Sequence, residues 1–374
     1  MKLTRQTKIN ILSSARYHQY YLARELALSG YDVKFYTCMP KKSVIRYGMP
    51  NKKFKTIFWL ISPFFFLERK VFKGVPFFFK LRVWLQDLMT LLLMRKCDII
   101  ISNSSGYTLC IRKAKKKGTK VIVHRGSKHI LEQKRILETI PSLHGESGIS
   151  NFIIKRELED YATADYVAVQ TEHVKRSFLK HNYPEKQLGV IPTGVDLSEF
   201  YPIPNTEKEY DVIMVGGWRY RKGCDLIVET IRQTDLKFLH VGGIVDMEFP
   251  QESNFTHVDV VKQKELVNYY NKAKIFLFPS REEGLAMVQA QAIACNLPLV
   301  GSKDSGAEDL KKLIGNSKYI TILEDYNVET IKKAVYKALD DYKKMGNTIY
   351  AKGYLQNLTW TAYKERYISF LTSL

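Results

Sequence analysis

Residues 276–310 read FLFPSREEGLAMVQAQAIACNLPLVGSKDSGAEDL and constrain the possible fold more than any other stretch of the sequence. A short apolar strand is predicted over residues 275–278, and it ends in a turn at Pro279. A helix is predicted over residues 285–296, and residues 297–300 open another strand. A strand, a helix and a second strand in this order are typical of a parallel sheet in an α/β protein. In such a unit the helix begins at the carboxyl edge of the sheet, where ligands bind.

The start of this helix offers hydrogen-bond donors to an anion or a sugar. The first amides of a helix have no partner within it and carry about half a positive charge, which suits a phosphate or a sugar oxygen. Here they belong to Leu285, Ala286 and Met287. Glu283 precedes them, and an ionised carboxylate only accepts hydrogen bonds, as from the hydroxyls of a sugar ring. Gln291 lies eight positions further on, about two turns inside the helix.

This segment resembles the signature of glycosyltransferase family 4, a Glu, seven residues and a second Glu, in which Gln291 here replaces the second Glu. The resemblance implies that Glu283 and Gly284, with the helix amides, bind the donor sugar, and that Gln291 binds the nucleotide ribose through its amide. The segment VIPTGVD over residues 190–196 also resembles the family, where NGVD is usual. Read from the residues alone, a buried helix with a solvated Glu pair remains the alternative.

A glycine- and cation-rich loop follows the strand predicted over residues 210–215. Glycines let backbone amides approach a phosphate, and Arg or Lys neutralises its charge. The resemblance implies that Lys222 contacts the donor diphosphate as part of a Lys-Gly pair. It also implies that Arg219 replaces an arginine at the position held by Gly217. Solvent exposure of Arg219 is the alternative.

Two further residues follow from the resemblance. His124 ends the strand predicted over residues 120–124, and the family places a histidine there that faces the donor sugar across the cleft. Val261 is expected to contact the nucleotide base through its backbone, at the end of a strand over residues 257–261. A satisfied loop histidine is the alternative for His124.

The charge of the chain is concentrated in its first half. Residues 1–200 hold 35 Lys and Arg against 16 Asp and Glu, whereas the remainder is nearly neutral, within a total of +20. A basic domain indicates an anionic partner, such as a membrane face, a phosphate-bearing acceptor or nucleic acid. Arg125 and Lys128 are the predicted acceptor-binding cations, with an ordinary solvated surface as the alternative. No nucleic-acid motif is present, so a nucleic-acid partner is not expected.

The aromatic and basic region 56–96 is the predicted membrane contact. Residues 39–77 are expected to be irregular, and residues 78–96 to form a helix with a broad apolar face. Aromatic residues beside Lys and Arg suit the interface of a bilayer. A buried helix with a packed loop is the alternative.

Cysteine usage and hydropathy predict a cytoplasmic protein, peripheral at the inner face of the plasma membrane. The five cysteines form no CxxC pair and are predicted to be reduced core thiols. The N-terminus lacks the apolar run of a signal peptide, and no stretch of about 18 uncharged apolar residues predicts a membrane-spanning helix.

The length of 374 residues predicts two domains. The resemblance implies an α/β protein of GT-B architecture, in which two Rossmann-like parallel-sheet domains face each other across a cleft. The expected domains are a basic acceptor-binding domain over 1–195, a nucleotide-sugar domain over 196–355, and a C-terminal helix over 356–374 that crosses back to the first domain.

The implied activity is transfer of a hexosyl group from a nucleoside diphosphate sugar, UDP by default, with retention of anomeric configuration. The acceptor is expected to be a hydroxyl of a glycan or lipid-linked molecule in bacterial surface polysaccharide synthesis. The catalytic residues are predicted to be His124, Lys222 and Glu283, without a metal or other cofactor, because cations and a helix end can neutralise the diphosphate. A nucleotide-sugar epimerase and a non-catalytic nucleotide-sugar-binding protein remain alternatives.

Overall fold

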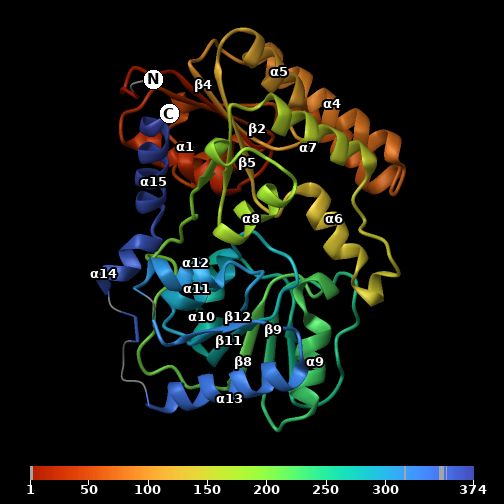
Figure 1. Ribbon diagram of the computed structural model, residues 1–374, viewed down its shortest axis with the longest axis vertical. Coiled ribbons are helices and arrows are strands. Elements are labelled where there is room, and N and C mark those ends of the chain that lie inside the picture. The colour runs from red at the N-terminus through yellow and green to blue at the C-terminus, as the bar shows by residue number, and fades with distance from the viewer. Residues whose placement is uncertain (1–2, 316, 345–348, 351) are drawn as a thin grey trace.

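The computed structural model describes residues 3–315, 317–344, 349–350 and 352–374, and it contains two parallel sheets, one in each half of the chain (Figure 1). The first sheet has the order β3-β2-β1-β4-β5-β6-β7, and every adjacent pair is parallel. Its strands are β1 (Ile9–Leu12), β2 (Val33–Thr37), β3 (Phe54–Thr56), β4 (Ile99–Asn103), β5 (Lys120–Arg125), β6 (Tyr166–Val169) and β7 (Leu188–Val190).

The second sheet has the order β10-β9-β8-β11-β12-β13 and is also parallel throughout. Its strands are β8 (Tyr210–Val215), β9 (Phe238–Val241), β10 (Phe255–Val258), β11 (Ala273–Phe278), β12 (Leu299–Ser302) and β13 (Ile320–Leu323). The change from one sheet to the other therefore falls between Val190 and Tyr210.

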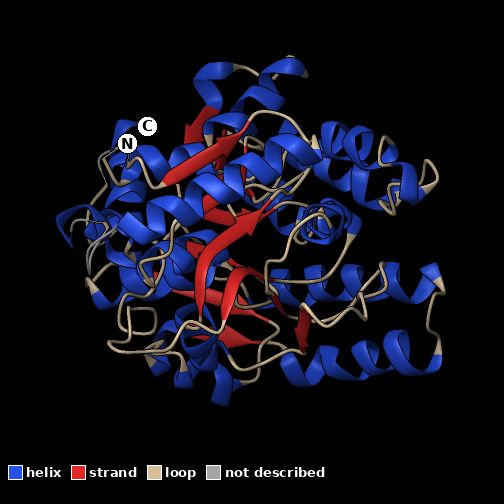
Figure 2. Cartoon of the chain, turned by 90° about the horizontal axis from the view of Figure 1, so that it is seen from below, coloured by secondary structure: helices blue, strands red, loops and turns tan. Residues whose placement is uncertain are grey.

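Helices connect the strands and surround both sheets (Figure 2). Those of the first half are α1 (His18–Leu28), α2 (Lys41–Arg46), α3 (Phe58–Phe66), α4 (Pro76–Leu93), α5 (Thr108–Lys116), α6 (Ile130–Glu138), α7 (Asn151–Thr163) and α8 (Glu172–Lys180). Those of the second half are α9 (Cys224–Arg232), α10 (Leu266–Asn271), α11 (Met287–Ala294), α12 (Ala307–Leu313), α13 (Val328–Lys344), α14 (Lys352–Leu355) and α15 (Trp360–Ser373). A π-helical turn (Leu67–Val71) continues α3.

The composition of the strands explains why both sheets are interior layers. β4 begins with three isoleucines and β11 ends with Phe-Leu-Phe, and these side chains are buried. Strands covered by helices on both faces need such uninterrupted apolar runs. The parallel α/β organisation predicted from the sequence is therefore confirmed.

The C-terminal helix α15 returns to the first domain, as predicted, and lies beside α1 (Figure 1). Trp360 stacks on Tyr21 with their ring centroids 3.9 Å apart and their ring planes nearly parallel. Gly189 of β7 admits this packing, because a Cβ there would lie 2.4 Å from the Phe370 ring. The chain crosses between the domains twice at one place, where the Val195 amide donates to the Leu358 carbonyl at 2.6 Å.

Two predicted elements differ in the structure. Residues 39–77 are largely helical, in α2, α3 and the π-helical turn, and also supply the edge strand β3; they are not irregular as predicted. Exposed aromatic residues and Pro63 within α3 obscure the periodicity that normally identifies a helix. The strand predicted over 257–261 is β10, which ends at Val258.

Candidate active site

Two loops meet at the carboxyl edge of the second sheet, one following β8 and the other following β11. Gly223, with a φ of +72°, closes the first loop, and a Cβ there would lie 2.3 Å from the Pro279 carbonyl oxygen of the second. The Arg281 amide donates to the Arg221 carbonyl at 2.9 Å. The Arg281 guanidinium forms two hydrogen bonds with Asp225, at 2.6 and 2.7 Å. These contacts fix the cation-rich loop against the turn that carries the two glutamates.

Lys222 and Glu283 meet where these loops touch. The Lys222 Nζ forms an ion pair with Glu283 Oε1, and Arg221 contacts the same oxygen at 3.2 Å. Both side chains of the Lys222–Glu283 pair are 14% exposed. Burial, with Arg221 alongside, lowers the pKa of the Lys222 ammonium well below its usual value. The structure therefore brings together two residues that the sequence separates by 61 positions.

Arg219 lies in the same loop, half-buried beside Gly217. A Cβ at Gly217 would be 3.4 Å from the Arg219 Nε. Within the described parts of the chain, Arg219 has no carboxylate partner, unlike Arg221 and Lys222. Its guanidinium is therefore available to an anion. Val261 is half-buried in the loop after β10 and packs against the core of the second domain.

Glu282 occupies a different environment from its neighbour Glu283, because its side chain is fully buried. It accepts hydrogen bonds from Arg221 at 3.0 Å, from the Gln133 amide nitrogen at 2.9 Å and from the Lys128 backbone amide at 3.2 Å. Burial raises the pKa of Glu282, but Arg221 and these other donors outweigh it, so the net shift is downward. Glu282 is thus an ionised carboxylate that joins the two domains.

Two backbone amides at the start of helix α11 are not free hydrogen-bond donors. α11 begins at Met287, and the two preceding amides already have partners: Leu285 donates to the Gln170 side chain at 2.8 Å, and Ala286 donates to the Ser305 carbonyl at 3.3 Å. In this structure both amides have protein partners, and the ligand contact predicted for Leu285 and Ala286 stays a prediction. Gln170 follows β6, so the first domain supplies the partner.

Backbone contact between the domains explains this closure. A Cβ at Gly284 would lie 2.2 Å from the Gly126 carbonyl oxygen, so only glycine permits such an approach. Thr171 donates to the Gly284 carbonyl at 3.3 Å, and the His173 Nε2 lies 2.8 Å from the Glu283 carbonyl oxygen. Gly284 is thus a contact between the domains, and its predicted contact with the donor stays a prediction.

Gln291 points into the second domain. It is 5% exposed, and its amide oxygen accepts a hydrogen bond from the Tyr270 hydroxyl at 2.9 Å. The predicted contact of Gln291 with a nucleotide ribose stays a prediction; in this structure its amide oxygen has a partner inside the domain.

His124 lies beneath another histidine, His18, which sequence reasoning missed. His124 is 1% exposed, and its Nδ1 is 2.9 Å from the His18 Nε2, while its Nε2 is 3.5 Å from the Tyr363 hydroxyl. His18 and α15 cover the His124 ring in this structure, and its predicted approach to the donor sugar stays a prediction. Burial lowers the pKa of His18 to about 3 and that of His124 well below its usual value.

A chain of hydrogen bonds connects these histidines to the second domain. Since the Gln170 side-chain oxygen accepts from Leu285, its amide nitrogen donates to the His18 Nδ1 at 3.2 Å. This fixes the proton of neutral His18 on Nε2, which then donates to His124. The start of α11 is thereby linked to Tyr363 on α15.

The two predicted acceptor-binding cations are already paired. Arg125 contacts Glu157 at 2.8 Å and Gln133 at 2.6 Å, and Lys128 forms an ion pair with Asp304 of the second domain. Both side chains are about one-tenth exposed. In this structure Arg125 organises the first domain and Lys128 joins the domains, and their contact with an acceptor stays a prediction.

A cavity of about 810 Å³ lies in the first domain beside these residues. Its walls come from the π-helical turn, the start of α4, and helices α6 and α7, and they include Arg69, Lys73, Arg125 and Gln133. Because Gln133 also donates to Glu282, one side chain separates the cavity from the loops of the second domain.

The residues that sequence reasoning missed share a recognisable position. Gln170 follows β6 and His18 opens α1 after β1, so both lie at the carboxyl edge of the first sheet, like His124. The rule that ligands bind at this edge selects all three positions. In the described residues, no cluster of three or more His, Cys, Asp or Glu side chains could hold a metal ion. No helix in that part of the chain has the length and apolar character needed to cross a membrane.

Family models match both halves of the chain. The model described as Glycosyltransferase Family 4 matches residues 15–199, and the model described as Glycosyl transferases group 1 matches residues 198–353. Together they extend from α1 to α14.

Individual relatives agree with these matches. A probable sucrose-phosphate synthase of Thermosipho melanesiensis is 25% identical over 56% of this chain and 54% of its own length. A GDP-mannose-dependent α-(1-6)-phosphatidylinositol monomannoside mannosyltransferase of Mycolicibacterium smegmatis is 24% identical over 48% of this chain and 54% of its own. The chain therefore matches about half the length of these curated relatives.

The solved structure of HepE from Anabaena in complex with UDP and glucose has the same fold. It superposes with a TM-score of 0.66 over 99% of this chain and all of its own, at 12% identity. Two parallel-sheet domains, a returning C-terminal helix and the two family matches lead to one conclusion: this chain belongs to the glycosyltransferases of the GT-B fold.

Proposed function

We propose that this protein is a retaining hexosyltransferase that moves a sugar from a nucleoside diphosphate to a hydroxyl group. The observation that carries the proposal is the convergence of Arg219, Lys222 and Glu283 at the carboxyl edge of the second sheet. A diphosphate needs cations at that edge, and a sugar ring needs a carboxylate beside them.

The ion pair between Lys222 and Glu283 is consistent with a site in which each side chain exchanges its protein partner for part of the donor. Each side chain compensates the other while no ligand is present. A donor diphosphate supplies Lys222 with a new anion, and the sugar hydroxyls supply Glu283 with new donors, so both charges stay compensated in the complex. Arg219, which has no carboxylate partner within the described residues, adds a second cation.

The chemistry we propose is electrostatic. Negative charge grows on the leaving diphosphate as the sugar departs, and Lys222 and Arg219 stabilise it. Glu283 holds the sugar in position, which lowers the entropic cost of transfer. The acceptor hydroxyl oxygen attacks the anomeric carbon from the side that the diphosphate leaves, which retains the anomeric configuration, and its proton passes to the departing diphosphate. Because the protein supplies the cations, we expect transfer to continue in the presence of EDTA.

A uridine nucleotide is the proposed donor. HepE, whose fold this chain shares, was solved with UDP and glucose, whereas the mycobacterial relative is named for GDP-mannose. The likeness to HepE extends over 99% of this chain, whereas the match to the mycobacterial relative covers 48% of it. We therefore propose UDP before GDP.

The acceptor hydroxyl is proposed to enter through the cavity lined by Arg69, Lys73 and Gln133. This cavity adjoins the second-domain loops through the hydrogen bond from Gln133 to Glu282. Its cations suit a glycan or a lipid-linked acceptor that bears phosphate, and the proposed process is bacterial surface polysaccharide synthesis at the cytoplasmic side.

The test is a thermal-stabilisation screen with UDP-, GDP- and ADP-sugars. A ligand at 100 times its Kd stabilises the folded state by about 2.7 kcal/mol, enough for a clear rise in melting temperature. We expect UDP-sugars to give the largest rise, Lys222→Ala and Glu283→Gln to abolish it, and Lys333→Ala to leave it unchanged, because Lys333 is exposed on α13. No rise with any sugar nucleotide contradicts the proposal.

Two further outcomes distinguish the alternatives. An epimerase makes a new sugar nucleotide from the donor alone, without acceptor. A binding protein is stabilised by donor but neither transfers nor hydrolyses the sugar, and Glu283→Gln then changes affinity only. NMR of the product from a transfer reaction reports whether the anomeric configuration is retained.

A further inference from the structure

The exposed phenylalanines and tryptophans among the described residues are gathered on one projecting helical hairpin, formed by α3, the π-helical turn and α4. Among the described residues, every exposed Phe and Trp lies in it; they are Trp59, Phe66, Phe72, Phe77 and Trp84. Trp59 is 82% exposed, whereas Trp218 and Trp360 elsewhere are buried. Soluble proteins rarely expose contiguous apolar patches of this kind without a partner.

The exposed residues follow helical spacing. Trp59, Pro63 and Phe66 recur at the i, i+4 and i+7 positions of α3, and Phe77, Lys80 and Trp84 recur at i, i+3 and i+7 on α4. The inner faces are used for packing: Ile57, Ile61 and Phe65 contact the cluster that includes Leu85 and Met89. Each helix thus has one face in the protein and one apolar face that no described residue covers.

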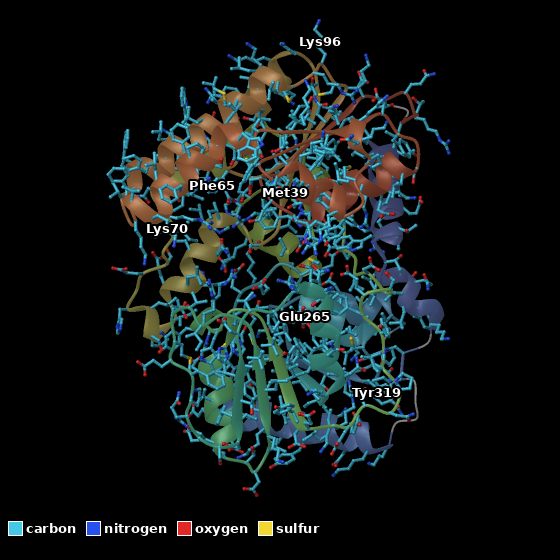
Figure 3. The ribbon with its side chains drawn as sticks, turned by 180° about the vertical axis from the view of Figure 1, so that it is seen from behind. Met39, Phe65, Lys70, Lys96, Glu265 and Tyr319 are labelled. Carbon is cyan, nitrogen blue, oxygen red and sulfur yellow. The ribbon has the colours of Figure 1, made fainter. Side chains whose placement is uncertain are left out.

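Cations accompany these aromatic residues. Arg69, Lys70, Lys73 and Lys80 are exposed, whereas the carboxylates of the same segment, Glu68 and Asp87, are paired with Arg82 and Arg156. Figure 3 places Lys70 at the edge of the molecule, with Phe65 further along the hairpin toward the rest of the first domain. The surface is therefore apolar and positively charged at once.

We propose that this hairpin, residues 58–93, is a docking surface for an anionic phospholipid bilayer. Aromatic side chains settle at the level of the headgroups, and Lys and Arg contact the anionic phosphates. A protein partner is a poorer fit, because lysine is depleted in protein interfaces, and three of the four exposed cations are lysines.

The position of the hairpin fits this assignment. Arg69, Lys73, Val75 and Pro76 at its tip also line the cavity of about 810 Å³ that reaches Gln133 and, through it, Glu282. A bilayer at the tip therefore lies beside a cavity whose wall includes Gln133, a side chain that contacts the second domain. The inference does not depend on which sugar is transferred, and its test measures binding to vesicles rather than activity.

The experiment is flotation of the full-length protein with vesicles of phosphatidylcholine alone and with 30% phosphatidylglycerol. We expect binding only to the anionic vesicles. Each cation near such a surface changes binding roughly fivefold, so K70Q/K73Q/K80Q should weaken it on the order of 100-fold. The matched control is K264Q/K303Q/K333Q, which removes three exposed lysines from the second domain and should bind nearly as the natural protein does.

A second variant tests the aromatic contribution. Phe66 and Phe77 are 61% and 63% exposed, so F66S/F77S should fold normally and lose anionic-vesicle binding at least tenfold. Its control is Y336S/Y354S, which changes two tyrosines of the second half that are 45% and 51% exposed.

Tryptophan fluorescence identifies the surface that touches the vesicle. Since Trp59 and Trp84 are the exposed tryptophans, a blue shift and quenching by brominated lipid should follow binding, and W59F and W84F should each reduce them. Binding without any change in emission, or equal loss in the lysine controls, overturns the proposal. So does a dimer in solution that F66S/F77S converts to a monomer, because the hairpin is then a contact between protein copies.

Discussion

Two adjacent glutamates show how strongly environment separates identical side chains. Glu282 is fully buried among Arg221, Gln133 and the Lys128 amide, whereas Glu283 retains some exposure and is paired with Lys222. The first residue holds the domains together, and the second is the one that we propose exchanges its partner for a ligand. Their order in the sequence, Glu-Glu-Gly, does not reveal this division.

Substitution should separate the two roles. Glu282→Ala leaves the Arg221 charge and two other donors without their acceptor, which should cost about 3 kcal/mol of unfolding free energy. Glu283→Gln should cost less, about 1–2 kcal/mol, because its amide oxygen still accepts a hydrogen bond from Lys222, while abolishing stabilisation by donor. Urea denaturation measures both variants, and equal losses would contradict the assignment.

Buried histidines make the stability of the folded protein sensitive to mild acid. Burial lowers the pKa of His18 to about 3 and that of His173 and His240 to about 4. An unfolded histidine titrates near 6.5, so below that pH the unfolded state binds more protons than the folded state. The free energy of unfolding should therefore fall as pH decreases from 6.5 toward 4, by up to about 1.4 kcal/mol per pH unit per histidine.

Two buried carboxyls act in the opposite direction. Burial raises the pKa of Asp160 to about 8 and that of Asp309 to about 6, so the folded state keeps these protons and gains stability as pH decreases. His124 and His129 have lowered pKa values as well, so the histidines outnumber the two carboxyls. Urea titrations at pH 7, 6 and 5 measure the net effect of these histidines and carboxyls on the free energy of unfolding. A midpoint that stays constant or rises on acidification would refute the predicted loss of stability.

At the scale of elements, the site depends on how closely two loops approach at the edge of the second sheet. Gly223 and Gly118 both have a left-handed φ, of +72° and +76°, but only Gly223 faces a neighbour, the Pro279 carbonyl. Gly118→Ala should cost about 1 kcal/mol from backbone strain alone. Gly223→Ala should cost clearly more and displace Lys222, so donor stabilisation should be lost in this variant only.

Thermal melting with and without the best sugar nucleotide measures both glycine variants. If Gly223→Ala behaves like Gly118→Ala in both measurements, the contact between the loops does not position the cations. The two positions share the same backbone region, so any difference between them reports the contact with Pro279.

Across the whole molecule, the last helix of the chain completes the core of the first domain. Trp360, Tyr363, Tyr367 and Leu371 are buried against residues of α1 and the first sheet. Trp360→Ala should cost about 3–5 kcal/mol, the usual range for a large buried aromatic side chain. Trp59→Ala, at an exposed position, should change the unfolding free energy by less than about 0.5 kcal/mol.

Chemical denaturation of Trp360→Ala and Trp59→Ala measures how much α15 contributes to the stability of the first domain. Equal midpoints would mean that α15 adds little to the first domain. A large loss confined to Trp360→Ala would show that the first domain cannot reach full stability without the end of the chain.

The sequence by itself determined the alternation of strands and helices, the second-domain loops with Lys222 and Glu283, and the return of the C-terminal helix. These features depend on apolar runs, glycines and charges that are close together in the chain, or on motifs that the family shares. The prediction for residues 39–77 also depended on local patterns. It was wrong because exposed aromatic residues obscure the helical periodicity of this segment.

Only the tertiary structure decided which of the predicted polar groups remain available. Leu285 is occupied by Gln170, which precedes it by 115 residues, and Lys128 is paired with Asp304, 176 residues away. His124 is covered by His18 and by Tyr363 from α15. Such pairings arise when two separately folded sheets close on each other, and local sequence patterns carry no information about the partner that a distant segment will supply.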